Sequence, residues 1–246
     1  MCESCGCGDP EVVPVDVHDN ILSGNNHRAQ HNRVHFREHA VFAVNLMGSP
    51  GAGKTAVLEA TARQLAGRAR CGALAGDLAT DRDAARLNRA GVPALSITTG
   101  NACHLDAKMV HHALHTFDWK QLDYLFVENV GNLVCPAVYD LGQDVNVVAL
   151  AVTEGEDKPV KYPVMFRKAD LVLLTKVDLL PVLPKLDVQA ILDGIAQVMP
   201  ANTVIRFSAE TGEGVDEWLA WLAARREGAM IDRVTCCGAM EHHHGH

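Results

Sequence analysis

The chain has 246 residues, of which 48% are hydrophobic, and it carries a formal net charge of −8 at pH 7. This length and composition are typical of one globular α/β domain with short extensions, and the negative charge argues against nucleic acids and anionic membranes as partners, since both are bound by clustered Lys and Arg. No apolar run reaches the roughly 20 residues of a membrane span, and the first ten residues lack the basic start of a secretory signal, so we expect a cytoplasmic protein.

Residues 1–40 are expected to form an extension rich in metal-binding side chains. They begin with CESCGCG, which places Cys2, Cys5 and Cys7 close together. In a cytoplasmic protein such cysteines are ligands or reactive thiols more often than disulfides. Histidines follow at positions 27, 31, 35 and 39, a four-residue step that puts them on one side of a helix. For these histidines we favour a solvated helix face over a metal site.

A phosphate-binding loop follows the first predicted strand. The apolar strand at 41–47 leads directly into GSPGAGKT at 48–55, and a helical pattern follows at 56–67. The segment satisfies G-x-x-x-x-G-K-[ST] between a strand and a helix, which is the context that this motif requires. We expect Lys54 to bridge the β- and γ-phosphates and to act in catalysis, and Thr55 to bind Mg²⁺. The predicted nucleotide-binding residues here are Gly48, Ser49, Gly51, Ala52, Gly53, Lys54, Thr55 and Ala56.

Acidic side chains follow two later strands. Asp77 comes directly after the apolar run at 71–76, Asp83 lies six residues further on, and Glu128 ends the run YLFVE. Because the carboxyl ends of parallel strands meet at one edge of a sheet, we expect these carboxylates to join Thr55 around Mg²⁺. Asp77 is also the candidate to orient the attacking water. Helix capping by Asp83 or its neighbour Asp81 is the alternative, and without a recognisable arginine finger we expect slow hydrolysis.

A cysteine and a histidine lie side by side in TTGNACHLDA, residues 98–107. Cys103 is expected in the loop after the strand at 94–98 and His104 at the start of the next helix, where the helix N-terminus favours a thiolate. Cys135, in ENVGNLVCP, leaves the same edge of the sheet. We therefore favour a metal site of Cys103, His104 and Cys135 over simple core packing, with His112 as a further candidate ligand.

Two later segments predict guanine recognition. In TKVD, residues 175–178, the carboxylate of Asp178 can accept hydrogen bonds from the N1–H and exocyclic amine of guanine, with Lys176 along the base. The segment FSAETG offers the backbone N–H groups of Ser208 and Ala209 to the guanine oxygen. These segments are similar to the base-specificity motifs of GTPases, although Thr175 stands where Asn is usual.

Strands and helical patterns alternate through residues 41–227. Such alternation predicts βαβ units, and the predicted fold class is therefore α/β: a P-loop NTPase with a mostly parallel sheet of about seven strands and helices on both faces. Residues 228–246 lose this periodicity and form a tail rich in Cys and His.

Six blocks together resemble one family: GSPGAGKT, GDLATDRDA, TTGNACHLDA, ENVGNLVCP, TEGEDKPVKYP and SAETGEG. They are similar to the signature blocks of the hydrogenase-maturation nickel-insertion GTPases, the HypB family. The resemblance runs from about residue 18 to residue 225, and it is specific because unrelated GTPases lack the blocks with CHLDA and ENVGNLVCP. The head CESCGCG is similar to the nickel-binding C-x-x-C-G-C terminus of some members.

The resemblance implies a GTP hydrolase that binds GTP or GDP with Mg²⁺, forms a homodimer and couples its nucleotide state to metal binding and release. It also implies delivery of nickel to the hydrogenase large-subunit precursor, together with a small partner nickel metallochaperone. Nickel itself rests on the resemblance, because thiolate and imidazole donors suit Zn²⁺ as well. The implied ligands form two sets: Cys103, His104 and Cys135 in the GTPase domain, and Cys2, Cys5 and Cys7 in the head.

Two other functions stay open at this point. One is a metal-storage protein with an auxiliary nucleotide site. The other is a P-loop kinase that grips a small substrate with Cys103 and His104, which predicts ATP preference, whereas TKVD and SAETG favour guanine.

Overall fold

The protein is described from a computed structural model, which covers residues 15–100, 102–199 and 203–240, without the side chains of 15–21 and 233–240. The predicted head ligands Cys2, Cys5 and Cys7 and the terminal HHHGH lie outside the described residues. The nickel site of the head therefore stays a prediction.

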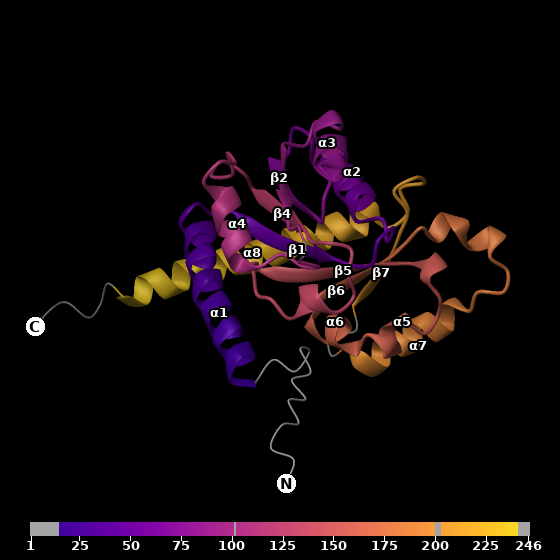
Figure 1. Ribbon diagram of the computed structural model, residues 1–246. Helices are drawn as coiled ribbons and strands as arrows, with labels where there is room; N and C mark the ends of the chain where they lie inside the picture. Colours follow the sequence, from indigo (N-terminus) through magenta and orange to yellow (C-terminus); the bar gives the residue numbers. More distant parts are fainter. Residues whose placement is uncertain (1–14, 101, 200–202, 241–246) are drawn as a thin grey trace, which may run out of the picture.

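A seven-stranded sheet forms the centre of the molecule (Figure 1). Neighbouring strands pair in parallel, in the order β3-β2-β4-β1-β5-β6-β7. The predicted α/β fold with about seven strands is thus confirmed. The strands are β1 (Phe42–Met47), β2 (Cys71–Asp77), β3 (Ala94–Thr98), β4 (Tyr124–Glu128), β5 (Val145–Ala151), β6 (Leu171–Thr175) and β7 (Val204–Phe207).

Helices cover both faces of the sheet. Successive side chains of a strand point to opposite faces, and because the strands are mostly apolar, both faces must be covered. On β1, Phe42 and Val44 join a core with α2 and α8, whereas Ala43 joins a core with α1 and α4. The helices are α1 (Val15–Glu38), α2 (Lys54–Leu65), α3 (Arg82–Arg89), α4 (Ala107–Leu114), α5 (Lys158–Lys161), α6 (Pro163–Lys168), α7 (Val188–Val198) and α8 (Val215–Met240). Short 3₁₀ helices are η1 (Cys135–Ala137), η2 (Val152–Glu154) and η3 (Val177–Val182).

Two helix boundaries differ from the sequence prediction. Helix α4 begins at Ala107, after the N-cap Asp106, whose side chain accepts a hydrogen bond from the Met109 N–H at 2.7 Å. His104 therefore lies in the loop before the helix and not at its start. Helix α8 continues past Glu227 to Met240, because a helix that has begun gains a backbone hydrogen bond with each added residue and meets no proline here.

The N-terminal extension enters the fold as the predicted helix, α1, which lies along α4 (Figure 1). Arg33 of α1 forms an ion pair with Asp140, in which one guanidinium nitrogen, Nη2, lies 2.8 Å from both carboxylate oxygens. Among the described residues no helix combines the length and the apolar character needed to cross a membrane.

Candidate functional site

The phosphate loop connects β1 to α2 and contains three glycines with positive φ. Gly48, Gly51 and Gly53 have φ values of 148°, 77° and 90°. A Cβ on Gly48 would lie 2.4 Å from the Ala149 carbonyl oxygen, so only glycine fits this close approach. Lys54 opens α2, and its Nζ donates to the carbonyl oxygens of Gly48 at 3.3 Å and Ser49 at 3.1 Å. The loop thus has the curled form that surrounds a phosphate.

A cavity of about 570 Å³ opens over this loop, and the predicted acidic residues line it. The Thr55 hydroxyl lies 2.8 Å from Glu128 Oε1 and 3.1 Å from Asp83 Oδ1. Asp77 lines the same cavity and accepts hydrogen bonds from the Leu78 N–H and the Thr80 hydroxyl. The structure therefore brings all four predicted Mg²⁺ residues to one wall.

Glu128 is the buried member of this group. Burial raises the pKa of its carboxyl to about 7, although Lys54 and the Thr55 hydroxyl act in the opposite direction. Burial likewise lowers the pKa of Lys54, against the attraction of Glu128 and Asp83. The second oxygen of Glu128, Oε2, is buried without a hydrogen-bond partner. A carboxylate oxygen in this condition fits a cation, which would compensate its burial.

Capping explains neither Asp81 nor Asp83. Asp81 takes the N-cap position of α3 without a side-chain cap hydrogen bond, and Asp83 faces Thr55. The sequence analysis missed Arg86, which also lines the cavity while both arms of its guanidinium contact Glu59, at 2.7 and 2.6 Å. Its position one helical turn after Asp83 is the signal that would have found it.

A smaller cavity of about 190 Å³ lies beside the loop, where Lys176, Asp178 and Ala209 line it together with Ala56. The Ser208 hydroxyl donates to Asp178 Oδ1 at 2.6 Å and so orients the carboxylate. Lys176 adopts a left-handed backbone with φ 59°. Of the residues predicted to recognise guanine, Lys176, Asp178 and Ala209 thus line one pocket from the segments that follow β6 and β7, and Ser208 contacts Asp178 beside it.

Thr175, the residue in place of the usual Asn, connects this pocket to the phosphate loop. It is buried, and its hydroxyl donates to the Ala52 carbonyl oxygen at 2.6 Å. Ala52 is fully buried. Since a hydroxyl is enough to satisfy that carbonyl, Thr can replace Asn here without leaving a buried polar group unpaired.

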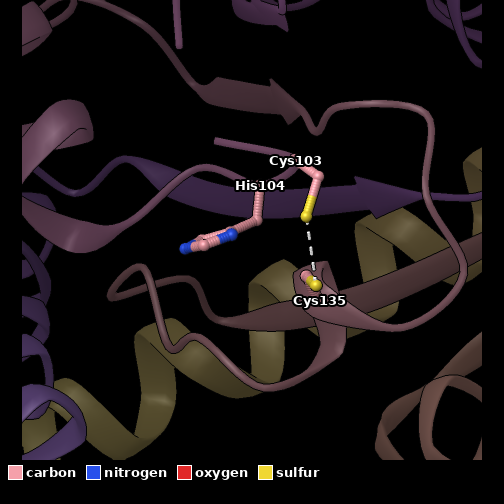
Figure 2. A group of neighbouring side chains, drawn as sticks. All are labelled: Cys103, His104 and Cys135. Atoms are coloured by element: carbon pink, nitrogen blue, oxygen red, sulfur yellow. Dashed lines mark hydrogen bonds between the residues drawn. The ribbon is translucent and has the colours of Figure 1, made fainter. Parts of the chain in front are cut away.

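Cys103, His104 and Cys135 come together at the neighbouring strand ends (Figure 2). One ligand atom from each residue lies within 4.8 Å of the others, and the two sulfur atoms are 3.2 Å apart. Metal–sulfur bonds of about 2.3 Å hold two thiolates of one ion about 3.2–3.8 Å apart. Both cysteines are free thiols, so the spacing suits a shared ion.

His104 is held for this site by its neighbours. Its ring stacks on Tyr139, with centroids 3.9 Å apart, and its Nδ1 is buried without a hydrogen-bond partner. Burial lowers the pKa of His104 and so favours the neutral imidazole that binds metals. The donor set and the unpaired nitrogen fit a borderline divalent ion such as Zn²⁺ or Ni²⁺.

Two features of this site bear on the predicted ligands. Burial raises the pKa of the Cys135 thiol, and nearby Cys103 raises it further. His112 is exposed, and its ring lies 6.4 Å from that of His115. The three-residue group around Cys103 does not include His112, because α4 turns its 112 position toward solvent.

A short loop, residues 129–132, joins the two sites. Gly131 lies so close to the phosphate loop that a Cβ would come within 2.8 Å of the Pro50 nitrogen. The Asn132 N–H donates to the Gly48 carbonyl oxygen at 3.1 Å, and its side-chain amide donates to the Cys103 carbonyl oxygen at 3.3 Å. Cys135 follows three residues later. One loop therefore contacts the phosphate loop and both metal-site cysteine segments.

Comparison with known proteins agrees with this arrangement. A family model described as "CobW/HypB/UreG, nucleotide-binding domain" matches residues 42–206. The hydrogenase maturation factor HypB of Azotobacter vinelandii is 50% identical over 218 residues, which cover 89% of this chain and 72% of the relative. The chain belongs to the HypB family.

Solved HypB structures share the fold. HypB from Helicobacter pylori in complex with nickel has a TM-score of 0.79 and 34% identity, over 84% of this chain and 97% of that one. HypB from Archaeoglobus fulgidus has a TM-score of 0.77 and 38% identity, over 83% of this chain and all of that one. Both sequence identities are high enough to indicate membership of one family as well as a shared fold.

Proposed function

We propose that this chain is a GTP-hydrolysing nickel metallochaperone that delivers nickel for [NiFe]-hydrogenase maturation and couples its nucleotide state to metal binding and release. One observation carries the proposal: the loop of residues 129–132 hydrogen-bonds to both the phosphate loop and the segment of Cys103. A change at one site therefore has a direct route to the other. Nickel as the cargo is supported by HypB from Helicobacter pylori, whose crystal structure is a complex with nickel.

The nucleotide side of the mechanism follows from the cavity over the phosphate loop. Backbone N–H groups and Lys54 bind the phosphates, and Asp178 with the backbone at Ala209 selects guanine. Thr55, Asp83 and Glu128 would hold Mg²⁺, which neutralises charge on the β- and γ-phosphates when bound. Asp77 orients a water whose oxygen attacks the γ-phosphorus, and the bridging oxygen leaves with GDP.

The metal side is a switch in affinity. A nucleotide-dependent shift of residues 129–132 moves Asn132, which in turn sets the distance between the segments that carry Cys103 and Cys135. Coupling requires that the metal bind one nucleotide state better than the other, since equal affinities shift nothing. We propose that a homodimer carries out this cycle in the cytoplasm. Its partners are a small nickel metallochaperone, which works alongside it, and the hydrogenase large-subunit precursor. Cys2, Cys5 and Cys7 add a second nickel site in the head.

Nickel titration in three nucleotide states tests the proposal. The full chain is titrated with Ni²⁺ in the presence of GDP, of a non-hydrolysable GTP analogue, or without nucleotide. We expect at least a fivefold difference in affinity between the GDP and GTP-analogue states, within the usual range of coupling free energies. The Cys103→Ala/Cys135→Ala variant should lose this nucleotide-dependent class of sites.

Cys71→Ala is the matched control. Cys71 is the remaining free thiol among the cysteines whose side chains the structure describes, and burial raises its pKa to about 12, so its removal should leave nickel binding unchanged. Equal nickel affinity in all three nucleotide states, or a nucleotide dependence that survives in the double variant, would contradict the proposal.

A further inference from the structure

A cluster of imidazoles lies between α1 and α4, outside the two sites described above. The rings of His35 and His111 stack with centroids 5.9 Å apart, and the ring of His115 lies 4.9 Å from that of His111. These three residues, the histidine seam, line a cavity of about 440 Å³ together with Glu38 and Trp119. Figure 1 shows the two helices that form it side by side at one end of the sheet.

The spacing of the seam suits metal ligands. His111 on α4 and His115, the C-cap of α4 with a helical backbone, are four residues apart and so project from the same side. Two histidines at this spacing form the helical half of known zinc sites. His35 faces them from α1, which supplies a third imidazole from a different element.

A buried amide fixes which nitrogen of His111 carries the proton. Asn32 is fully buried, and its Nδ2 donates to the carbonyl oxygens of Ala107 at 2.9 Å and Leu141 at 3.0 Å. Both amide protons are thus used, and the Oδ1 of Asn32 must accept from His111 Nδ1 at 3.0 Å. His111 Nε2 therefore keeps its lone pair. Metal-binding histidines are held by the same kind of contact on their second nitrogen.

Burial and nearby positive groups act in the same direction on His111. Burial lowers the pKa of His111, and His115, Arg28, His35 and His31 lower it further. Glu38, Asp118 and Lys120 line the cavity, and Glu38 Oε2 lies 3.5 Å from His35 Nδ1. Neutral imidazole is the form that binds a metal ion, and the two carboxylates offset the nearby cations.

We propose that His35, His111 and His115 form a further transition-metal site, separate from Cys103, His104 and Cys135, for a borderline divalent ion such as Ni²⁺ or Zn²⁺. Imidazole donors suit such ions. Within the described part of the chain, only Cys103, His104 and Cys135 already have three possible ligand atoms close enough to share one ion. The side chains of the seam must therefore move to bind one. A metal ion would bind when the side chains of the exposed His115 and the half-buried His35 rotate toward His111, which Asn32 holds in place.

The proposed site gives different roles to the four histidines that the sequence pattern places on one side of a helix. His27 and His31 pair with each other on the exposed side of α1, with centroids 4.8 Å apart. His35 instead turns toward α4, and His39 packs edge-on against Trp119 at 5.2 Å. A solvated face describes His27 well but not His35.

Paramagnetic NMR tests the site in the full chain, where other groups also bind nickel. Ni²⁺ broadens signals of nearby protons, and Trp119 provides a local reporter because it lines the seam cavity and its indole N–H donates to the Leu114 carbonyl oxygen. Trp218, on α8, provides an internal reference because its indole N–H is buried against Thr61 on the other face. In the Cys103→Ala/Cys135→Ala background, we expect Ni²⁺ to remove the Trp119 indole signal well before that of Trp218. Zn²⁺ should shift the Trp119 signal without broadening it.

His35→Ala/His115→Ala in the same background should raise the Ni²⁺ concentration needed to broaden Trp119 at least tenfold. Both side chains reach solvent, and unchanged signal dispersion will show that the fold is kept. His27→Ala is the matched control on α1 and should change nothing. Equal broadening of both tryptophans, or unchanged broadening of Trp119 in the double histidine variant, would overturn the proposal.

Discussion

At the scale of single residues, Thr175 shows how a substitution in a motif keeps its structural role. The side chain has no amide, yet its hydroxyl reaches the Ala52 carbonyl oxygen at 2.6 Å and ties β6 to the phosphate loop. The same loop is held on its other side by Ser49, whose hydroxyl donates to Glu154. One hydroxyl contact from β6 and one to η2 thus hold the curl that Lys54 completes.

Thr175→Val removes this hydroxyl at constant shape and leaves the buried Ala52 carbonyl unpaired. The free energy of unfolding should fall by about 1–3 kcal/mol, seen in urea titration as a lower midpoint with an unchanged m-value. GTP should also bind more weakly, because the phosphate loop loses an anchor. Thr116→Val is the control: Thr116 makes a comparable bond to the Ala113 carbonyl but is exposed, and it should change stability by no more than about 0.5 kcal/mol. Equal effects of the two substitutions would refute the role of Thr175.

At the scale of elements, α1 is held to the domain by polar contacts as much as by apolar ones. Phe36 is buried against the core with Trp119, while Asn25 and Asn32 reach across to α4 and to the loop before β5. Asn25 accepts from the Ala107 N–H at 2.9 Å and so supplies a partner to the first turn of α4. The extension is therefore a structural part of the domain, and its docking orders the helix that follows His104.

Asn32→Ala deletes two donors to buried carbonyls and the acceptor of His111. The free energy of unfolding should fall by about 2–4 kcal/mol, and amide hydrogen exchange in α1 and α4 should accelerate more than exchange in β1 or β5. Asn26→Ala, an exposed position on the same helix, should have little effect on either measurement. Uniform exchange across the domain would argue against a separate docking role for Asn32.

At the scale of the whole molecule, residues 129–132 connect chemistry at two strand ends. Glu128 ends β4 in the nucleotide cavity, and the chain then crosses the phosphate loop before it reaches Cys135. Asn129 adds a second link, since its Oδ1 accepts from the Leu105 N–H at 3.1 Å, directly after His104. The loop is short and contacts both sites, so we expect a shift at one end to be felt at the other.

Gly131→Ala tests this connection, because the added Cβ would press against the Pro50 backbone. Overpacking of about 1–3 kcal/mol predicts nucleotide binding that is weaker by on the order of 10- to 100-fold. The difference in nickel affinity between GDP and GTP-analogue states should shrink with it, both measured by calorimetric titration. Gly24→Ala is the control: its Cβ meets nothing within 4 Å, and in a helix it should leave binding unchanged and raise stability by about 0.5–1 kcal/mol. Normal nucleotide affinity in Gly131→Ala would exclude the loop as the connection.

The sequence by itself determined the sheet and the phosphate loop, and it named the candidate metal donors that the structure brings together. Apolar runs such as Val145–Ala151 must be buried on both faces, and the glycines of 48–53 permit few other backbones, so these features are local consequences of composition. The tertiary structure decided what depends on contacts between distant segments. It turned His112 outward, brought Arg86 to the cavity, placed Gly131 against Pro50 and set His35 against His111. Side chains far apart in sequence meet only when packing fixes the angle and register of their elements, and no local pattern encodes that distance.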